Sequence, residues 1–306
     1  MSITVIIPYY NEADTILLTI KALVNQKTLP EKILFIDSGS TDDSSKIIDN
    51  YIIDNEQNNS MKNIYSGKMS PSSSLNAGLE YSSTTYVALM DCGLEISDKW
   101  LYDHLRIIKK NNIGCVSTCI YTRGQSIFDK AMVSQTYGYK NMTPCLPGSL
   151  IKSKVFESTG NFIEGIRSGY DTDFIHKLKL HNIKREVIYY NCLKYFATNY
   201  SNTSIAAFKK VYSYSLAGWK SKGDKKPYIY ILLALLMLIF LFSHHYVVFL
   251  YYLLFRGFLV PLWKSKSFAL IYEPLILSIT PYTGFLIDVS RTLGYFVTIP
   301  FISRNK

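Results

Sequence analysis

The chain has 306 residues, which allows one large domain or two, with a sizeable buried core. The formal net charge is +10, and six lysines but a single acid lie between Lys209 and Lys226, immediately before the most apolar part of the chain. A basic run beside an apolar run favours an anionic membrane surface over nucleic acid as the partner, with an ordinary solvated helix face as the alternative.

The first 90 residues alternate strand-like and helix-like segments. Apolar and β-branched runs predict strands, and helical spacing of apolar residues predicts helices between them. This order predicts an α/β fold with a mainly parallel sheet and helices on both of its faces. Residues 121–143 show no clear period, and we expect a mobile loop there. Strands are expected at 3–7, 32–36, 62–66 and 85–90, and helices at 14–24, 41–52 and 72–83.

Two of these strands end on a carboxylate. Asp37 follows the strand at 32–36, and Asp91 follows the strand at 85–90. The carboxyl ends of parallel strands lie on one edge of the sheet, where ligands bind in such folds. We therefore expect both aspartates to border a ligand crevice, with a helix cap or a turn as the alternative for each.

Four segments together resemble the family 2 glycosyltransferases, which have the nucleotide-sugar-binding GT-A fold. The resemblance covers roughly residues 1–220, and it depends on the order and the intervals of the segments, since each alone is common. The segments are VIIPYYNE (5–12), FIDSGSTDDS (35–44), SSSLNAGLEYSSTTYVALMDCG (72–93) and GYDTDFIHKL (169–178).

The resemblance implies roles for the matching positions. The loop after the first strand would line the nucleotide pocket, and Asp37 would contact the base or ribose. Asp91 matches the first Asp of the Asp-x-Asp element, which implies a divalent cation, Mg²⁺ or Mn²⁺, and Asp171 matches the acid of the later catalytic motif. The expected nucleotide-sugar-binding residues are Pro8, Tyr10, Asn11, Glu12, Asp37, Asn76, Gly78 and Asp91.

The chemistry of sugar transfer needs these residue types. Negative charge develops on the diphosphate leaving group, and a divalent cation held by carboxylates offsets it. The acceptor hydroxyl loses a proton, so a carboxylate must lie within hydrogen-bond reach of it. Asp171, at the start of a helical segment, is the expected base. Charge complementation at a helix N-terminus is the alternative for Asp171 and Asp173.

The sequence departs from the family pattern at two motifs. The Asp-x-Asp element reads DCG at 91–93, similar to the members with Asp-x-Gly and a Trp-Leu pair a few residues later, here at 100–101. One metal ligand is therefore missing or supplied from elsewhere. Glu95 is a candidate, with a solvated turn residue as its alternative. The later Gly-Glu-Asp motif reads GYD at 169–171, so a single acid remains there.

The acceptor side of the site is expected in residues 144–162, which resemble the family's segment before the catalytic acid. Gly148 and Ser149 could let the backbone approach the donor sugar, with an ordinary turn as the alternative. The Gln-x-x-Arg-Trp signature of processive synthases is absent, and 207–219 occupy that region. We therefore expect transfer of a single sugar. An inverting outcome follows from the resemblance and from one base without an evident nucleophile.

A membrane-associated region is expected after a catalytic domain at 1–226. No formally charged residue occurs from Tyr228 to Phe255. A helix of that length would measure about 42 Å, longer than a hydrocarbon core of ~30 Å. Two crossings therefore fit better than one tilted helix, with a soluble core as the alternative. Within 227–306, crossings are expected at about 228–242 and 246–263, then an interfacial or re-entrant segment at 267–302.

The catalytic domain is expected on the cytoplasmic face of the membrane. Lysines and arginines flank the apolar pair at both ends, which predicts cytoplasmic ends. The N-terminus has no basic region before its first apolar run, so no signal peptide is expected. Five cysteines without a Cys-x-x-Cys pair predict mostly structural thiols in a reducing compartment.

The leading hypothesis is thus a membrane-anchored glycosyltransferase that uses a nucleotide-diphosphate sugar and a lipid-linked or surface-glycan precursor as acceptor. A catalytically inactive sugar-nucleotide-binding or scaffold protein is the alternative, because the DCG and GYD motifs are altered. A dinucleotide oxidoreductase shares the sheet class, but it is disfavoured because PYYNE, and no GxGxxG, follows the first strand.

Overall fold

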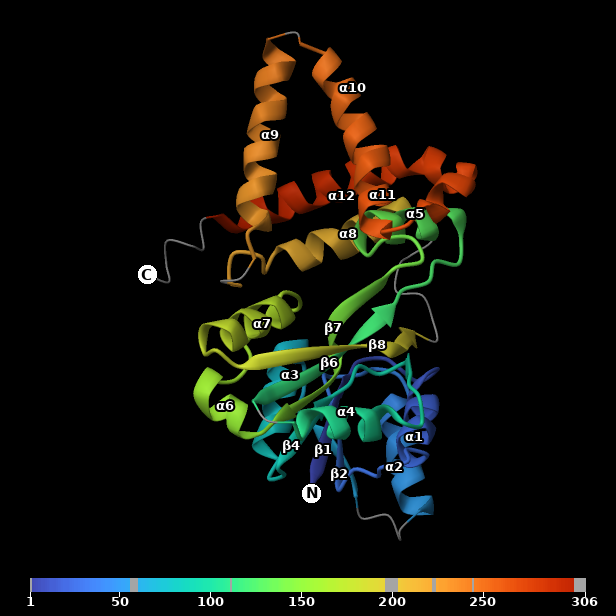
Figure 1. Cartoon of the computed structure of the whole chain (residues 1–306), viewed down its shortest axis with the longest axis vertical. Coiled ribbons are helices and arrows are strands. Elements are labelled where there is room, and N and C mark those ends of the chain that lie inside the picture. Colours follow the sequence, from blue (N-terminus) through green and yellow to red (C-terminus); the bar gives the residue numbers. More distant parts are fainter. Residues whose placement is uncertain are drawn as a thin grey trace. The chain divides into compact units, whose positions relative to one another are not determined.

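The computed structural model describes residues 2–55, 60–110, 112–195, 203–221, 224–243 and 245–299. The chain divides into two compact units (Figure 1). Unit 1 comprises Met1–Ile120 and Pro144–Ala197, and unit 2 comprises Tyr121–Thr143 and Thr198–Lys306. The expected boundary at residue 226 does not coincide with this division, because residues 121–143 and the helix from residue 204 pack with the C-terminal helices.

The fold is built on an eight-stranded, mixed sheet in the order β3-β2-β1-β4-β7-β6-β8-β5. Its first four strands pair in parallel, which confirms the expected mainly parallel α/β fold and all four expected strands. β7 is antiparallel to β4, and β5 is antiparallel to β8. The strands are β1 (Ile3–Tyr9), β2 (Lys32–Asp37), β3 (Met61–Tyr65), β4 (Tyr86–Leu89), β5 (Leu94–Glu95), β6 (Ile113–Tyr121), β7 (Met142–Lys152) and β8 (Lys184–Tyr195).

Helices cover both faces of this sheet, and alternation along β1 shows why. Val5 and Ile7 belong to a core cluster shared with α1, α2 and α4, whereas Ile6 belongs to a second cluster shared with α3, α6 and α7. Successive side chains of a strand point to opposite faces, so an unbroken apolar strand must be covered on both sides. These helices are α1 (Ile16–Val24), α2 (Ser44–Asp54), α3 (Pro71–Glu80), α4 (Trp100–Ile108), α6 (Lys154–Thr159) and α7 (Tyr170–Leu180).

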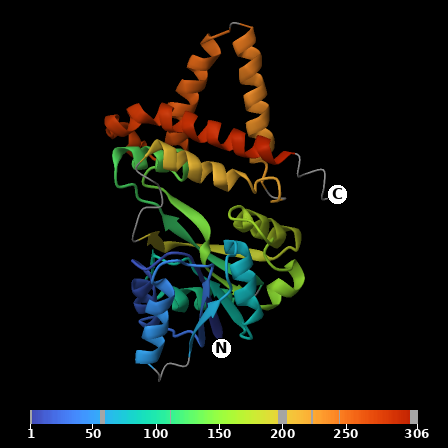
Figure 2. The same ribbon diagram turned by 180° about the vertical axis from the view of Figure 1, so that it is seen from behind.

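Unit 2 is helical. Its longest helix, α12, lies beside α5 and α8, as Figure 2 shows from the opposite side. The expectation of a mobile loop at 121–143 is wrong, because α5 is buried on both sides: Ala131 packs with Ile276, and Met132 packs with Ile287. The helices are α5 (Ile127–Thr136), α8 (Ser204–Ser215), α9 (Lys226–Phe242), α10 (Val247–Leu254), η1 (Phe255–Leu259), α11 (Val260–Ser265), η2 (Phe268–Tyr272) and α12 (Pro274–Thr298).

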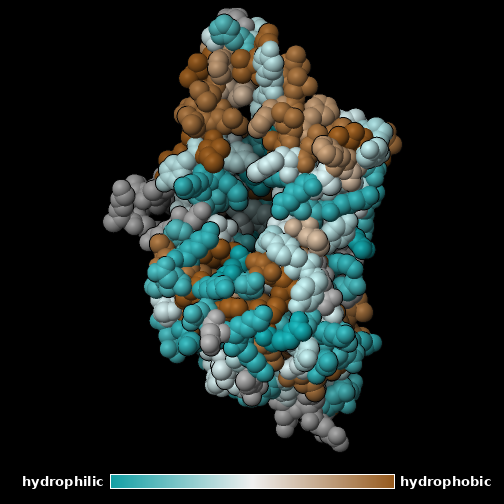
Figure 3. Space-filling view, in the orientation of Figure 1, coloured by the Kyte–Doolittle hydropathy of each residue, from teal (hydrophilic) through white to brown (hydrophobic). Residues whose placement is uncertain are grey.

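The helices α9 and α10 form a hairpin with an apolar surface (Figure 3). Only Pro227 is buried in α9, and no residue of α10 is buried. In the part of the chain that the structure describes, one helix, Val247–Ser265, is long and apolar enough to cross a membrane by length and composition. α9 is apolar but shorter, with 17 residues.

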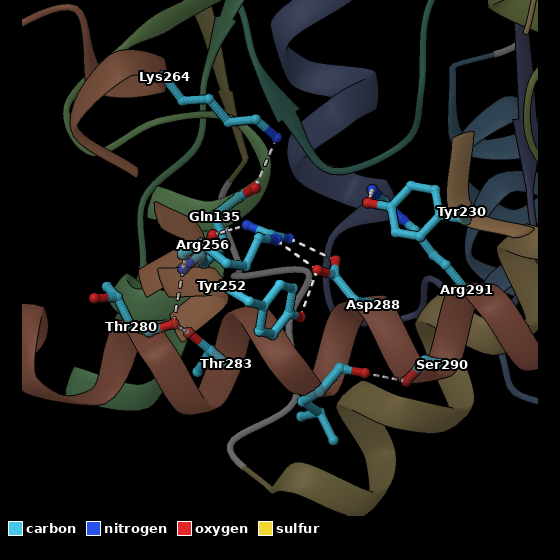
Figure 4. A network of polar contacts seen from close by, with 11 residues as sticks. Gln135, Tyr230, Tyr252, Arg256, Lys264, Thr280, Thr283, Asp288, Ser290 and Arg291 are labelled. Atoms are coloured by element: carbon cyan, nitrogen blue, oxygen red, sulfur yellow. Dashed lines mark hydrogen bonds and ion pairs between the residues drawn. The ribbon is translucent and has the colours of Figure 1, made fainter. Parts of the chain in front are cut away.

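A buried polar network joins η1 to α5 and α12 (Figure 4). Arg256 donates hydrogen bonds from Nε and Nη2 to the carboxylate of Asp288, at 2.8 and 2.9 Å, and from Nη1 to Oε1 of Gln135. The hydroxyl of Tyr252 also donates to Asp288, and Gln135 Nε2 donates to the carbonyl of Thr280 at 2.7 Å. Arg256 and Asp288 are both buried, so each charge depends on the other for compensation.

Candidate functional site

The loops that follow β1 and β2 are hydrogen-bonded to each other at the carboxyl edge of the sheet. The backbone N–H of Asn11 donates to Oγ of Ser40 at 3.1 Å, and Oδ1 of Asn11 accepts from the backbone N–H of Thr41 at 2.8 Å. The backbone N–H of Glu12 donates to Oγ of Ser44 at 2.7 Å. These bonds bring the expected nucleotide loop, Pro8 to Glu12, directly against the loop that follows Asp37.

Tyr10 and Asn11 lie at the open side of this pair of loops. The side chain of Tyr10 is 54% exposed, although a tyrosine ring is largely apolar. Asn11 has a φ of 55°, in the left-handed region that asparagine tolerates better than most residues. The loop thus presents an aromatic face to solvent. The proposed contacts of Pro8, Tyr10 and Asn11 with a nucleotide remain predictions.

Asp37 shapes its own loop. It is buried, and Oδ1 accepts hydrogen bonds from the backbone N–H groups of Gly39 and Ser40, at 3.1 and 2.8 Å. Its Oδ2 accepts from Oγ of Ser45 at 3.1 Å, and Ser45 also hydrogen-bonds with the hydroxyl of Tyr9. Burial raises the pKa of Tyr9 well above its ordinary value. These contacts match the turn-forming alternative, and contact of Asp37 with a base or ribose remains a prediction.

Asp91 lies at the same edge, one strand further along. The backbone N–H of Met90 donates to the carbonyl of Ile6 at 3.1 Å, which extends the pairing of β4 with β1 up to this aspartate. Asp91 is half-buried, whereas the next side chain, Cys92, turns into the core. Burial raises the pKa of the Cys92 thiol to about 12, so this cysteine is a structural thiol.

Gly93 occupies the third position of the altered motif, and its conformation explains the missing carboxylate. Its φ is +77°, in the left-handed region, and its N–H donates to Oγ1 of Thr19 at 3.0 Å. A Cβ at Gly93 would lie 3.3 Å from Oγ1 of Thr15 and 3.6 Å from Oε2 of Glu12. The space where a side chain would begin is thus bordered by the carboxylate of Glu12, and burial raises the pKa of that carboxylate.

Asp91 and Asp171 act on one shared neighbour, Cys145 of β7. Burial is the main cause that raises the pKa of the Cys145 thiol, and the charges of both aspartates raise it further. Arg185 opposes them, and its Nη2 donates to the carbonyl of Cys145 at 3.3 Å. Two carboxylates and one guanidinium therefore lie within electrostatic range of a single point in unit 1.

Asp171 and Asp173 both belong to the first turn of α7 but differ in their surroundings. Asp173 is buried and pairs with Lys177 at 3.3 Å, so the structural alternative describes this residue well. Asp171 is half-buried, and it is the carboxylate of the two that acts on Cys145. Its assignment as the base remains a prediction.

Asn76 and Gly78, both on α3, make close contacts inside the core of unit 1. The side chain of Asn76 is buried and binds both backbone groups of Phe162: Nδ2 donates to the carbonyl, and Oδ1 accepts from the N–H, each at 2.9 Å. A Cβ on Gly78 would lie 2.3 Å from Cγ2 of Ile6, so only glycine lets α3 approach β1 this closely. The observed contacts give both positions a packing role, and direct contact with a donor remains a prediction.

Gly148 and Ser149 lie inside the sheet, on β7. The carbonyl of Gly148 accepts from Nε1 of Trp100 at 2.9 Å. Ser149 is fully buried, and its Oγ donates to Oγ of Ser117 at 2.8 Å, which in turn accepts from Nε of Arg185 at 2.8 Å. This series of hydrogen bonds, from Ser149 through Ser117 to Arg185, orients the guanidinium. Contact of Ser149 with an acceptor remains a prediction.

Arg185 and Cys145 were not among the residues expected from the sequence. Arg185 lies in β8 between Lys184 and Glu186, and three consecutive charged residues give no local signal of a functional role. Cys145 and Cys115 are free thiols, but Cys119 is disulfide-bonded, which the cysteine spacing did not predict. Only the order of β7, β6 and β8 in the sheet brings Arg185 beside Cys145.

A divalent cation at Asp91 remains a prediction, and its other ligands would have to be oxygens of the substrate. Among the described residues, no group of three or more histidine, cysteine or acidic side chains could hold a metal. Glu95 is exposed on β5, where its register partner is Lys194. Mg²⁺ is commonly bound by one or two carboxylates together with substrate phosphates, and this arrangement needs no complete protein cage.

Comparison with known proteins identifies the family and the fold. The profile described as Glycosyl transferase family 2 matches residues 4–177. The structure is similar to mannosyltransferase PcManGT from Pyrobaculum calidifontis in complex with GDP-Man and Mn²⁺ (TM-score 0.58, 13% identity, 98% of this chain and 87% of that one). It is also similar to S. aureus TarS 1–349 in complex with UDP-GlcNAc (TM-score 0.50, 16% identity, 100% and 93%).

At these identities the structural likeness shows the fold alone. The chain covers 41% of a longer crystal structure of S. aureus TarS, and no curated protein sequence matches it. The family profile, by contrast, spans more than half of the chain and includes the loops after β1 and β2, Asp91 and Asp171. The chain therefore belongs to glycosyl transferase family 2 and is a glycosyltransferase with a GT-A-like fold.

Proposed function

We propose that this glycosyltransferase moves a single sugar, with inversion, from a nucleotide-diphosphate sugar to a lipid-linked or surface-glycan precursor. The observation that carries this proposal is the family 2 profile over residues 4–177, within which Asp91 follows β4 and Asp171 begins α7. Both carboxylates are half-buried. Arg185 on β8 donates hydrogen bonds to Ser117 on β6 and to Cys145 on β7. The relatives in complex with UDP-GlcNAc and GDP-Man support a sugar nucleotide as donor.

The donor would bind across the carboxyl ends of β1, β2 and β4. The exposed ring of Tyr10 offers a face for a base, and the loop that Asp37 shapes lies beside it. Asp91 would hold a divalent cation together with oxygens of the diphosphate, and this cation would offset the charge of the leaving group. The Mn²⁺ complex of the mannosyltransferase supports this use of Asp91.

The transfer step needs one base and no covalent intermediate. Asp171 would accept the proton of the acceptor hydroxyl, whose oxygen then attacks the anomeric carbon from the face opposite the diphosphate. The bond between that carbon and the diphosphate oxygen breaks, and its electron pair leaves with the nucleoside diphosphate. A single displacement of this kind inverts the anomeric configuration.

The apolar hairpin would anchor the enzyme in the membrane, with unit 1 on the cytoplasmic face. At 1.5 Å per residue, α9 measures about 25 Å and the exposed stretch from Val247 to Phe255 about 14 Å, both shorter than a hydrocarbon core of ~30 Å. From Arg256 onward the second helix packs on α5 and α12. These lengths favour a hairpin that enters the bilayer and turns back within it. Two helices that each cross the whole bilayer fit them less well.

The test is calorimetric titration of UDP, GDP, dTDP and CDP into the full-length protein in detergent, with and without Mn²⁺ or Mg²⁺. We expect one nucleotide to bind only with metal, and Asp91→Ala to abolish this binding. Asp171→Asn should keep nucleotide affinity and lose transfer. Metal-independent binding would exclude the cation role of Asp91. If none of the four nucleotides binds, the transferase proposal fails in favour of an inactive scaffold.

A further inference from the structure

Unit 2 contains a cavity that none of the donor-site residues lines. Its volume is about 330 Å³, at the lower end of the range for small-molecule sites. Three segments form its walls: the end of β6 with the turn that follows, one face of α5, and the turn after α5. The lining residues are Tyr121, Thr122, Arg123, Gly124, Lys130, Val133, Tyr139 and Lys140.

The polar lining is strongly cationic. Arg123, Lys130 and Lys140 come from the three different segments, and no acidic residue lines the cavity. The Arg123 guanidinium lies 5.5 Å from the ring centre of Tyr121, and the Lys140 ammonium lies 5.1 Å from that of Tyr139. Two of the cations thus lie over aromatic rings that also line the cavity, and both are exposed to solvent at its open side.

Two carboxylates lie close to the cavity and offset part of this charge. Glu273 contacts the Lys140 ammonium at 3.9 Å and accepts a hydrogen bond from the hydroxyl of Tyr139 at 2.7 Å. Asp129 accepts from the backbone N–H of Gln125 at 3.0 Å. The three cations that line the cavity outnumber these two carboxylates, and the Lys140–Glu273 pair is half-exposed, so its contribution is weak.

The wall of the cavity is fixed to the end of the apolar helix Val247–Ser265. The backbone N–H of Tyr139 donates to Oγ of Ser265 at 2.8 Å. The ammonium of Lys264 donates to the carbonyl of Gln135 at 2.7 Å and to that of Thr136 at 3.2 Å. If the hairpin is embedded in a bilayer as far as Phe255, this wall of the cavity lies about 15 Å further along the same helix, outside the hydrocarbon core.

We propose that this cavity binds the phosphate group of a lipid acceptor. Three converging cations match the several oxygens of a phosphate, with arginine as the fork-shaped donor and the lysines as point charges. The rings of Tyr121 and Tyr139 and the side chain of Val133 give the apolar part of such a molecule a surface to contact. This assignment rests on the proposed function, because it specifies the acceptor of that reaction.

The experiment measures binding of vesicles to the full-length protein in nanodiscs or detergent. Vesicles of phosphatidylcholine alone are compared with vesicles that contain 20 mol% phosphatidic acid (about one lipid in five), with inorganic pyrophosphate as a soluble competitor. The test variant is Arg123→Gln/Lys130→Gln/Lys140→Gln. The matched control, Lys109→Gln/Lys110→Gln/Lys154→Gln, removes three exposed lysine charges from unit 1.

We expect the test variant to lose at least about tenfold in affinity for phosphatidic acid vesicles, which corresponds to about 1.4 kcal/mol, and the control variant to lose less than about twofold. Binding of the nucleotide that the wild type prefers should be unchanged in both, which shows that unit 1 is folded. Single Arg123→Lys should keep more affinity than Arg123→Gln.

Three results would overturn the proposal. Equal losses in the test and control variants would indicate general attraction to anionic lipid. An unchanged test variant would exclude the cavity. Pyrophosphate that binds the cavity as tightly as the lipid would identify a free phosphate as its ligand. Failure of the proposed function looks different, since wild-type protein would then bind phosphatidic acid through the cavity but bind no nucleotide.

Discussion

Replacing Asn76 with alanine tests whether this residue holds the core or contacts the donor. The amide of Asn76 satisfies both backbone groups of Phe162 inside the core, so Asn76→Ala leaves a buried N–H and a buried carbonyl without this partner. Each such group costs about 1–3 kcal/mol, so the free energy of unfolding should fall by about 2–6 kcal/mol. For a unit of this size, about 2–4 °C per kcal/mol applies, so a mid-range loss of about 4 kcal/mol lowers the melting temperature by about 8–16 °C.

The assay follows thermal unfolding of the full-length protein in detergent by intrinsic fluorescence. The matched control is Asn161→Ala, the same substitution at an exposed neighbour of Phe162, which should change stability by less than about 0.5 kcal/mol. Nucleotide affinity of Asn76→Ala, measured well below its melting temperature, should equal that of the wild type. A melting temperature equal to that of the control, combined with lost nucleotide affinity, would refute the packing role and establish direct contact.

Three further substitutions test the core and the helical unit. Gly78→Ala should lower the free energy of unfolding by about 1–3 kcal/mol, because the added methyl group overlaps Ile6, and a denaturant titration that shows no loss would contradict this close contact. Burial lowers the pKa of His104 to about 4. As the pH drops from 6.5 towards 4, the histidine is protonated in the unfolded chain but not in the folded one, so the stability of the wild type should fall. Melting curves of His104→Leu should lack this dependence on pH. Arg256→Met and Asp288→Leu should each lower the free energy of unfolding by about 3–5 kcal/mol, because each leaves one buried charge unpaired. In a double-mutant cycle, the double variant should recover most of this loss. Additive losses would show that the two charges do not compensate each other.

Regular periodicity made the parallel half of the sheet predictable. The apolar run of β1 has no polar face, which is the pattern of a strand buried on both sides, and the core clusters on its two faces confirm it. The same argument placed Asp37 and Asp91 at one edge, because the carboxyl ends of parallel strands coincide. The strand pattern did not predict that the carboxylate of Asp37 accepts hydrogen bonds from Gly39 and Ser45, which follow it closely in the chain.

The helix α5 and Arg185 could not be predicted because their partners are distant in the sequence. α5 buries Ser134 and Gln135 fully, and a helix with buried polar residues shows no apolar stripe. The side-chain amide of Gln135 forms its hydrogen bonds with groups on η1 and α12. Arg185 gains its place through Ser117 and Cys145 on neighbouring strands. The sequence near Gln135 and near Arg185 predicts ordinary surface residues. Their hydrogen-bond partners come from segments that only the folded structure brings close.

The interleaving of the two units has a consequence for biosynthesis. Chain that leaves the sheet after β6 forms α5 and returns as β7, while the carbonyl of Thr280 that binds Gln135 lies 145 residues further along. At about 5–20 residues per second, a ribosome needs roughly 7–30 s to deliver that partner. During this interval α5 has neither α11 nor α12 to pack against. The nascent protein therefore exposes the side chains of α5 that become buried in the finished fold, Ser134 and Gln135 among them, until the last helix of unit 2 has been synthesised.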